Sequence, residues 1–174
     1  MNIDPTNPQL KGRDRLVVSK GHAGPAVYAT LAHKGYISRD ELLTLNKFGT
    51  NLPSHCDMNK TPGIDMTTGS LGQGLSCALG MAIASKIEND GAYIYCIIGD
   101  GESQEGQIWE ASMYASQVKA DNLIVFLDNN GMQIDNYTKD LNSLIDPVEK
   151  WKSFGFFVQA IDGNNIEEID DAII

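Results

Sequence analysis

Residues 93–101 read YIYCIIGDG, and residues 123–131 read LIVFLDNNG. Each stretch opens with a short apolar run rich in β-branched and aromatic residues, which predicts a buried strand. Polar residues follow each run at once, Asp100 in the first stretch and Asn130 in the second. Parallel strands end side by side, and ligands bind in the crevice beyond their carboxyl ends. We therefore expect these two side chains to meet at one edge of a parallel sheet.

The two side chains offer oxygen ligands of the kind that Mg²⁺ prefers. This ion takes a few protein oxygens in near-octahedral geometry and often completes its shell with phosphate oxygens. Asp100 and Asn130 thus predict half of a magnesium site, with a diphosphate supplying much of the rest. Two other interpretations stay open: Asn130-Gly131 is a turn signal that can close a hairpin, and Asp100 between two glycines can be an ordinary turn residue.

Helical patterns alternate with these strands along the chain. Apolar spacing predicts one helix from Leu71 to a stop signal at residues 89–91, and a second over residues 104–119. Asp146-Pro147 predicts the cap and first residue of a short helix, and residues 166–174 predict an amphipathic one. Residues 156–161, FFVQAI, predict a third strand. The alternation predicts an α/β fold, a doubly wound, mainly parallel sheet flanked by helices.

Length and charge limit the classes of protein. The 174 residues form one predicted domain, 1–174, large enough for a real core. We expect this domain to be incomplete, since residues 1–12 read as an irregular connector and the last helical pattern has no cap. A net charge of −10 argues against a nucleic acid or an anionic membrane as partner.

The next features concern targeting signals and cysteines in the sequence. The sequence contains no apolar stretch of membrane-spanning length and no signal peptide. The three cysteines are widely spaced and form no CxxC pair. Reduced thiols in a cytoplasmic protein are the expected state, with the cysteines serving as small apolar core residues.

Several motifs follow one another in an order that identifies a family. They are SKGHA at residues 19–23, TTGSLGQG at 67–74, GDGESQEG at 99–106 and DNN at 128–130. The GDG and DNN motifs, 26 residues apart, resemble the signature of thiamine diphosphate enzymes. In detail the four motifs resemble transketolase, from about Arg13 to the end of the chain. The resemblance implies the diphosphate-binding domain or subunit of a split transketolase, truncated at both ends and without the pyrimidine-binding domain.

The glycine-rich motif has a physical interpretation of its own. Glycines let backbone N–H groups approach an anion closely, and the dipole at a helix N-terminus favours negative charge. The spacing differs from the dinucleotide GxGxxG, and a turn with packing glycines is the alternative. By resemblance, Gly69, Ser70 and Leu71 line the cofactor near its thiazolium and aminopyrimidine parts. Ser70 stands where proline is common in the family.

The resemblance also implies the metal ligands and the diphosphate contacts. Asp100 and Asn130 would bind Mg²⁺, or Ca²⁺ or Mn²⁺ in its place, through their side chains, and Met132 would bind it through its main-chain oxygen. Gly101 and Asn130 would touch the diphosphate of thiamine diphosphate.

Three residues are candidates for catalysis. His22 and His55 lie in loop-like surroundings, where binding residues concentrate. By resemblance both face the reacting carbon of the thiazolium and the oxygens of the donor sugar, so His22 also counts as a cofactor contact. Glu105 matches a family glutamate at the dimer interface; its alternative interpretation is a first-turn glutamate favoured by the helix dipole. Cys56-Asp57, after the second histidine, departs from the family pattern.

The function implied by the resemblance is that of a transketolase subunit. It would move a two-carbon ketol unit from a ketose phosphate to an aldose phosphate, together with a pyrimidine-binding partner subunit, in a homodimer or heterotetramer. The alternatives are another thiamine diphosphate enzyme, such as deoxyxylulose-phosphate synthase, or a non-catalytic cofactor-binding subunit. Residues 100–106, DGESQEG, favour transketolase over the synthase.

Overall fold

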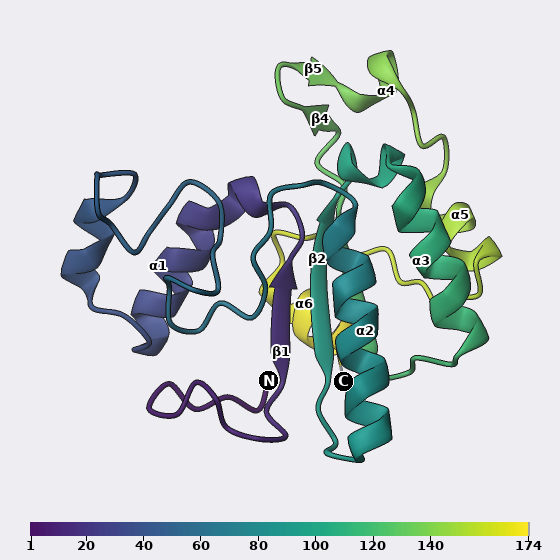
Figure 1. The fold of residues 1–174 in the computed structure, drawn as a ribbon. Helices are drawn as coiled ribbons and strands as arrows, with labels where there is room; N and C mark the ends of the chain where they lie inside the picture. The colour runs from purple at the N-terminus through teal and green to yellow at the C-terminus, as the bar shows by residue number, and fades with distance from the viewer. Residues whose placement is uncertain (174) are drawn as a thin grey trace.

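A parallel three-stranded sheet forms the centre of the molecule (Figure 1). The structure is a computed structural model that describes residues 1–173; Ile174, the last residue of the predicted amphipathic helix, lies outside the described residues. The strands are β1 (Arg15–Val18), β2 (Ile94–Gly99) and β3 (Leu123–Asp128), in the order β1-β2-β3. β2 pairs with both neighbours, and its last residue, Gly99, is in register with Asp128. All three strands therefore end at the same edge of the sheet.

Two long helices provide most of the apolar surface that covers the sheet. α2 (Gln73–Glu88) buries Leu75, Ala78, Leu79 and Ala82 at helical spacing, and α3 (Gly106–Gln117) buries Ile108, Ala111 and Ala115. These side chains form one core with Ile94, Cys96 and Ile98 of β2. In Figure 1, α2 crosses in front of the sheet and α6 (Ile166–Ile173) lies behind it. The predicted α/β class with a parallel sheet flanked by helices is confirmed.

Shorter elements complete the described chain. A second small core, around Tyr28 and Leu52, lies under α1 (Gly24–Lys34). The other elements are the 3-10 helices η1 (Gly21–Ala23), η2 (Arg39–Thr44) and η3 (Glu102–Gln104), strands β4 (Met132–Gln133) and β5 (Asn136–Tyr137), and helices α4 (Thr138–Leu141) and α5 (Pro147–Ser153). No helix in the described part of the chain is long and apolar enough to span a membrane.

One predicted strand is wrong, and three observed strands, β1 of the main sheet and the short β4 and β5, were not predicted. Residues 156–161 form no strand, although Phe156 and Val158 pack against the central core while Phe157 is exposed. This alternation is the pattern of a strand, but here it comes from side-chain packing without a backbone ladder. The third strand is β1 instead, whose run Leu16-Val17-Val18 was too short to be recognised by its pattern.

The turn signal at Asn130-Gly131 does not close a hairpin. β4 and β5 do pair antiparallel, with Met132 opposite Tyr137, but the chain reverses between Gln133 and Asn136. Asn130 and Gly131 lead from β3 into this small hairpin. Their position leaves Asn130 at the carboxyl edge of the sheet, as the magnesium interpretation requires.

Candidate functional site

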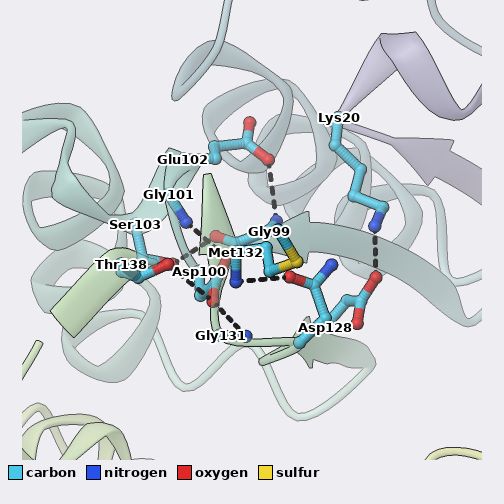
Figure 2. Close-up of polar contacts among 11 residues, drawn as sticks. Lys20, Gly99, Asp100, Gly101, Glu102, Ser103, Asp128, Gly131, Met132 and Thr138 are labelled. Atoms are coloured by element: carbon cyan, nitrogen blue, oxygen red, sulfur yellow. Dashed lines mark hydrogen bonds and ion pairs between the residues drawn. The ribbon is translucent and has the colours of Figure 1, made fainter. Parts of the chain in front are cut away.

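The carboxyl ends of all three strands contribute polar side chains to one edge of the sheet. Lys20 follows β1, Asp100 follows β2, and Asp128 is the last residue of β3. Lys20 Nζ pairs with the carboxylate of Asp128, so it reaches across the intervening strand (Figure 2). A methyl group on Gly99 would lie 3.6 Å from Lys20 Cδ, which places the lysine stem over the end of β2. A cation therefore lies over the edge where the strands end.

Asp100 is the most highly connected residue of this edge. Its side chain is buried, and Oδ1 accepts the N–H of Gly101 at 2.7 Å. Oδ2 accepts the N–H of Gly131 at 2.8 Å and the hydroxyl of Thr138 at 3.1 Å (Figure 2). The N–H of Asp100 itself donates to the carbonyl of Asp128 at 3.2 Å. Asp100 thus joins the loop after β2 to the loop after β3.

Asn130 and Met132 flank the residue that Asp100 holds. Oδ1 of Asn130 accepts the N–H of Met132 at 2.9 Å, which bends the chain around Gly131. The residues at this point carry a carboxylate, an amide oxygen and a main-chain carbonyl, all hard ligands, and only one is acidic. In keeping with this, no three His, Cys, Asp or Glu residues within residues 1–173 are placed so that they could hold a metal ion by themselves. The donor set fits Mg²⁺ sharing its coordination shell with phosphate oxygens.

The structure brings the two candidate histidines to one glycine-rich turn. Gly21 packs so closely that a methyl group there would lie 2.8 Å from the nitrogen of Gly69. Gly69 has φ +140°, and a methyl group on it would lie 3.0 Å from the imidazole carbon Cδ2 of His55. The loop that carries His22, the turn at Gly69 and the ring of His55 are therefore adjacent. Both histidine side chains are exposed.

The rest of the predicted cofactor residues lie at the start of α2. Ser70 and Leu71 are exposed, and Gly72 caps the helix with φ +86°. A pocket of about 180 Å³ opens beside this turn and is lined by Met66, Thr67, Thr68, Ser70, Gln73 and Gly74. The buried hydroxyl of Thr68 has no hydrogen-bond partner among the described residues. Space and an unpaired polar atom thus coincide at the predicted cofactor turn.

Glu105 lies against the same turn. A methyl group on Gly72 would lie 2.8 Å from Glu105 Cβ, so the first residue before α3 touches the residue before α2. Glu105 is exposed and caps α3 without a side-chain hydrogen bond to the helix. Its predicted role at an interface stays a prediction.

Cys56, one of the departures from the family pattern, is a packing residue. It is 2 % exposed and belongs to the small core under α1. Burial raises the pKa of its thiol, so the thiol stays protonated at neutral pH and is a poor nucleophile. Asp57 turns toward its own loop, where Oδ1 accepts the N–H of Asn59 at 2.9 Å and the hydroxyl of Thr67 at 3.3 Å.

Sequence reasoning missed four residues of this region: Ser19, Lys20, Glu102 and Thr138. Ser19, Lys20 and Glu102 stand inside the quoted motifs, which was the only signal for them. Their hydrogen-bond and ion-pair partners lie far away in the sequence, and the spacing of apolar residues does not indicate those partners. Thr138 belongs to no motif.

Comparisons with known proteins identify the family. The family model described as transketolase, thiamine diphosphate binding domain, matches residues 1–174. A 6-deoxy-6-sulfo-D-fructose transketolase subunit of Clostridium sp. (strain MSTE9) is 59% identical over 99% of this chain, and an apulose-4-phosphate transketolase subunit of Phocaeicola vulgatus is 42% identical over 97%. The chain spans 63% and 60% of the lengths of these two proteins.

A solved structure supports the same relationship. The transketolase of Campylobacter jejuni superposes with a TM-score of 0.93 at 34% identity, covering 99% of this chain and 28% of the other. The polar edge and the glycine-rich turn thus lie in a fold shared with that enzyme. The chain belongs to the transketolase family, through the thiamine diphosphate binding domain.

Proposed function

We propose that this chain is the diphosphate-binding subunit of a split, thiamine diphosphate-dependent transketolase. Its reaction would move a two-carbon ketol unit from a ketose phosphate to an aldose phosphate. The observation that carries the proposal is the hydrogen bond between Asp100 and Gly131. It holds a carboxylate, an amide oxygen and a backbone carbonyl at the edge where the strands end, next to the turn that carries Gly69.

Each residue of the site has a physical task in this proposal. Asp100, Asn130 and the main-chain oxygen of Met132 would hold Mg²⁺, which would bind the diphosphate together with the N–H of Gly101. Thiamine diphosphate, when bound, supplies the carbanion chemistry that breaks and forms the carbon–carbon bond. Lys20 lies at the same edge of the sheet, where it pairs with Asp128.

The two histidines would transfer protons to and from the sugar. Their imidazoles are exposed beside the glycine-rich turn, and imidazole is the most common general acid and base in enzymes. We propose that His22 and His55 donate and accept protons at the carbonyl and hydroxyl oxygens of the donor sugar. Glu105, at the contact between α2 and α3, would contribute to an interface with another active site.

The partner would be a pyrimidine-binding subunit, because the group that activates the aminopyrimidine of the cofactor belongs to that domain in the family. The relatives named as transketolase subunits favour this split arrangement over a single-chain enzyme. We propose a homodimer of this chain that becomes a heterotetramer with the partner. A non-catalytic role is less favoured, because His22 and His55 are present in addition to the proposed metal ligands Asp100 and Asn130.

The donor sugar can be tested on two candidates. A ketose phosphate is the general proposal, and the 59% identical Clostridium protein makes 6-deoxy-6-sulfo-D-fructose the second candidate. The chain would be co-expressed with a pyrimidine-binding subunit, then incubated with Mg²⁺, thiamine diphosphate, either donor and an aldose phosphate. A product two carbons longer than the acceptor, identified by mass spectrometry, is the expected result. In a parallel reaction with pyruvate in place of the sugar donor, formation of deoxyxylulose phosphate would instead support the synthase, and no product from any donor would contradict the proposal.

A further inference from the structure

Glu102 is a buried carboxylate that the proposed reaction does not use. Its side chain lies in η3, directly after Asp100-Gly101, and is 2 % exposed. Oε1 accepts the hydroxyl of Ser19 and the N–H of Gly72, the latter at 2.9 Å. Oε2 accepts the N–H of Gly99 at 3.1 Å (Figure 2). Among the ion pairs of the described residues, none includes Glu102.

The three donors come from three different elements. Ser19 follows β1, Gly72 precedes α2, and Gly99 ends β2. Ser19 is 83 residues from Glu102 along the chain and Gly72 is 30 residues away. Ser19 is fully buried, and its own N–H donates to Ile97 of β2 at 2.8 Å. One carboxylate therefore joins three segments that are distant in sequence.

Each segment leads directly to a proposed site residue. Ser19 is three residues before His22, Gly72 ends the turn that begins at Gly69, and Gly99 precedes Asp100. The packing is tight, because a methyl group on Gly74 would lie 2.7 Å from the Cα of Ser19. A small displacement of any one segment would therefore be transmitted to the others.

Burial of the Glu102 carboxyl group has a cost that its contacts must offset. A buried polar group is tolerated when it is hydrogen-bonded, and here both carboxyl oxygens accept hydrogen bonds. Packing alone does not require a polar group at this position, since apolar groups of similar volume often stabilise a fold as well as buried polar or ionic ones do. The carboxyl group instead provides acceptor oxygens for three donors at once.

We infer that Glu102 is a positioning residue of the cofactor site: it sets the spacing between the metal loop at Asp100, the turn at Gly69 and the loop that carries His22. This inference rests on the proposed function, because it concerns the same site. Glu102 itself does not touch the cofactor or the sugar. It acts through the backbone of Gly72 and Gly99 and through Ser19.

The test compares variants of the complete enzyme with its partner subunit. Glu102→Gln keeps the size of the side chain but replaces one acceptor oxygen with an NH₂ group, which faces a donor. Ser19→Ala removes one donor, and the double variant closes a double-mutant cycle. Glu88→Gln is the matched control, because Glu88 is exposed and its only ion pair among the described residues is a 3.7 Å contact with Lys11. Calorimetry measures the Kd of thiamine diphosphate in Mg²⁺, and thermal unfolding gives Tm without cofactor.

We expect Glu102→Gln to raise the Kd of thiamine diphosphate by about 10- to 100-fold, the range for one lost hydrogen bond to a charged group. Ser19→Ala should raise it less, and the double variant should fall short of the product of the two single effects. Glu88→Gln should bind like the wild type. An unchanged Kd for Glu102→Gln, with only Tm lowered, would make Glu102 a structural residue and overturn the inference. A wild-type enzyme that binds no thiamine diphosphate would overturn the proposed function, and this inference with it.

Discussion

Oδ2 of Asp100 lies 2.8 Å from the backbone nitrogen of Gly131, and this contact joins the loop after β2 to the loop after β3. The second carboxylate oxygen is held by the N–H of Gly101 at 2.7 Å. With backbone groups as its main partners, the position of Asp100 depends on the fold rather than on flexible side chains. Backbone contacts thus hold the carboxylate at the edge of the sheet, and a metal site requires ligands that are positioned in this way.

Replacement of Asp100 should abolish metal-dependent cofactor binding. Asp100→Ala removes the one charged ligand of the proposed set, so the negative charge of the diphosphate is less well compensated. In calorimetry of the complete enzyme, wild-type binding of thiamine diphosphate should require Mg²⁺ and disappear with EDTA, and the variant should show no binding in either condition. Asp121→Ala, an exposed position paired with Lys86, is the control and should bind normally. Unchanged affinity in Asp100→Ala would contradict the metal assignment.

His22 and His55 should affect turnover far more than stability. Both side chains are exposed, so His22→Ala or His55→Ala removes little packing. General acid–base assistance is worth about 10²–10⁴-fold, so kcat/KM should fall within that range while Tm changes little. His33→Ala, in the last turn of α1, should leave kcat/KM unchanged. Full activity of both variants would remove the histidines from the proposed mechanism.

Two glycines of α2 should respond to alanine in opposite directions. Gly80 faces open space, so Gly80→Ala should raise the free energy of unfolding by about 0.5–1 kcal/mol, the usual gain within a helix. A methyl group on Gly74 would lie 2.7 Å from the Cα of Ser19, so Gly74→Ala should lower it by about 1–3 kcal/mol. Urea unfolding of the purified chain measures both values. A higher free energy of unfolding for Gly74→Ala would show that the contact between α2 and the end of β1 is looser than described, and a lower one for Gly80→Ala would contradict the open space at that position.

Stability should fall at alkaline pH, in part through Tyr28. Burial raises the pKa of this phenol from 10.0 to about 12, and its hydroxyl donates to the carbonyl of Pro53 at 2.7 Å. Because the folded state holds the proton more tightly, this contribution is fully present below pH 10 and is lost as the pH rises from 10 through about 12. Between pH 9 and 11 the wild type should lose about 1 kcal/mol more of its free energy of unfolding than Tyr28→Phe. Equal losses, measured by urea unfolding, would contradict the raised pKa.

The parts of the site that follow strands were predictable, and the parts that depend on tertiary contacts were not. Asp100 and Asn130 come two and three residues after apolar runs, so the rule that parallel strands end together was enough to bring them together. The contact between Gly69 and His55 has no such signal, because it joins two loops without periodicity. Glu102 looks in sequence like an exposed glutamate before a helix, and only the folded chain shows that it is buried.

The error at residues 156–161 has a related cause. Phe156 and Val158 alternate with exposed neighbours, and period-two alternation indicates a strand whether or not a partner strand is available. The alternation of apolar residues indicates which side chains are buried. A strand in a sheet also requires a neighbouring backbone at the spacing that hydrogen bonds need. β1 was missed for the same reason. Its apolar run is short, and it forms a strand because it pairs with β2 along four residues.

The last prediction is that the purified chain has no ketol-transfer activity alone. Its recognisable motifs belong to the diphosphate half of the site. A cofactor held only through its diphosphate would lack the group that activates the aminopyrimidine. Exposed apolar side chains of α3, Met113 and Tyr114, favour association with another chain.

We therefore expect light scattering to show a dimer of the purified chain, and turnover to begin only after a pyrimidine-binding subunit is added. The assay contains Mg²⁺, thiamine diphosphate, a ketose phosphate donor and an aldose phosphate acceptor, with and without that subunit. Asp100→Ala in the presence of the subunit serves as the control, because it should remain inactive while still assembling. Substantial turnover by the chain alone would mean that it supplies the activating group itself, and the proposal of a shared active site would then be wrong.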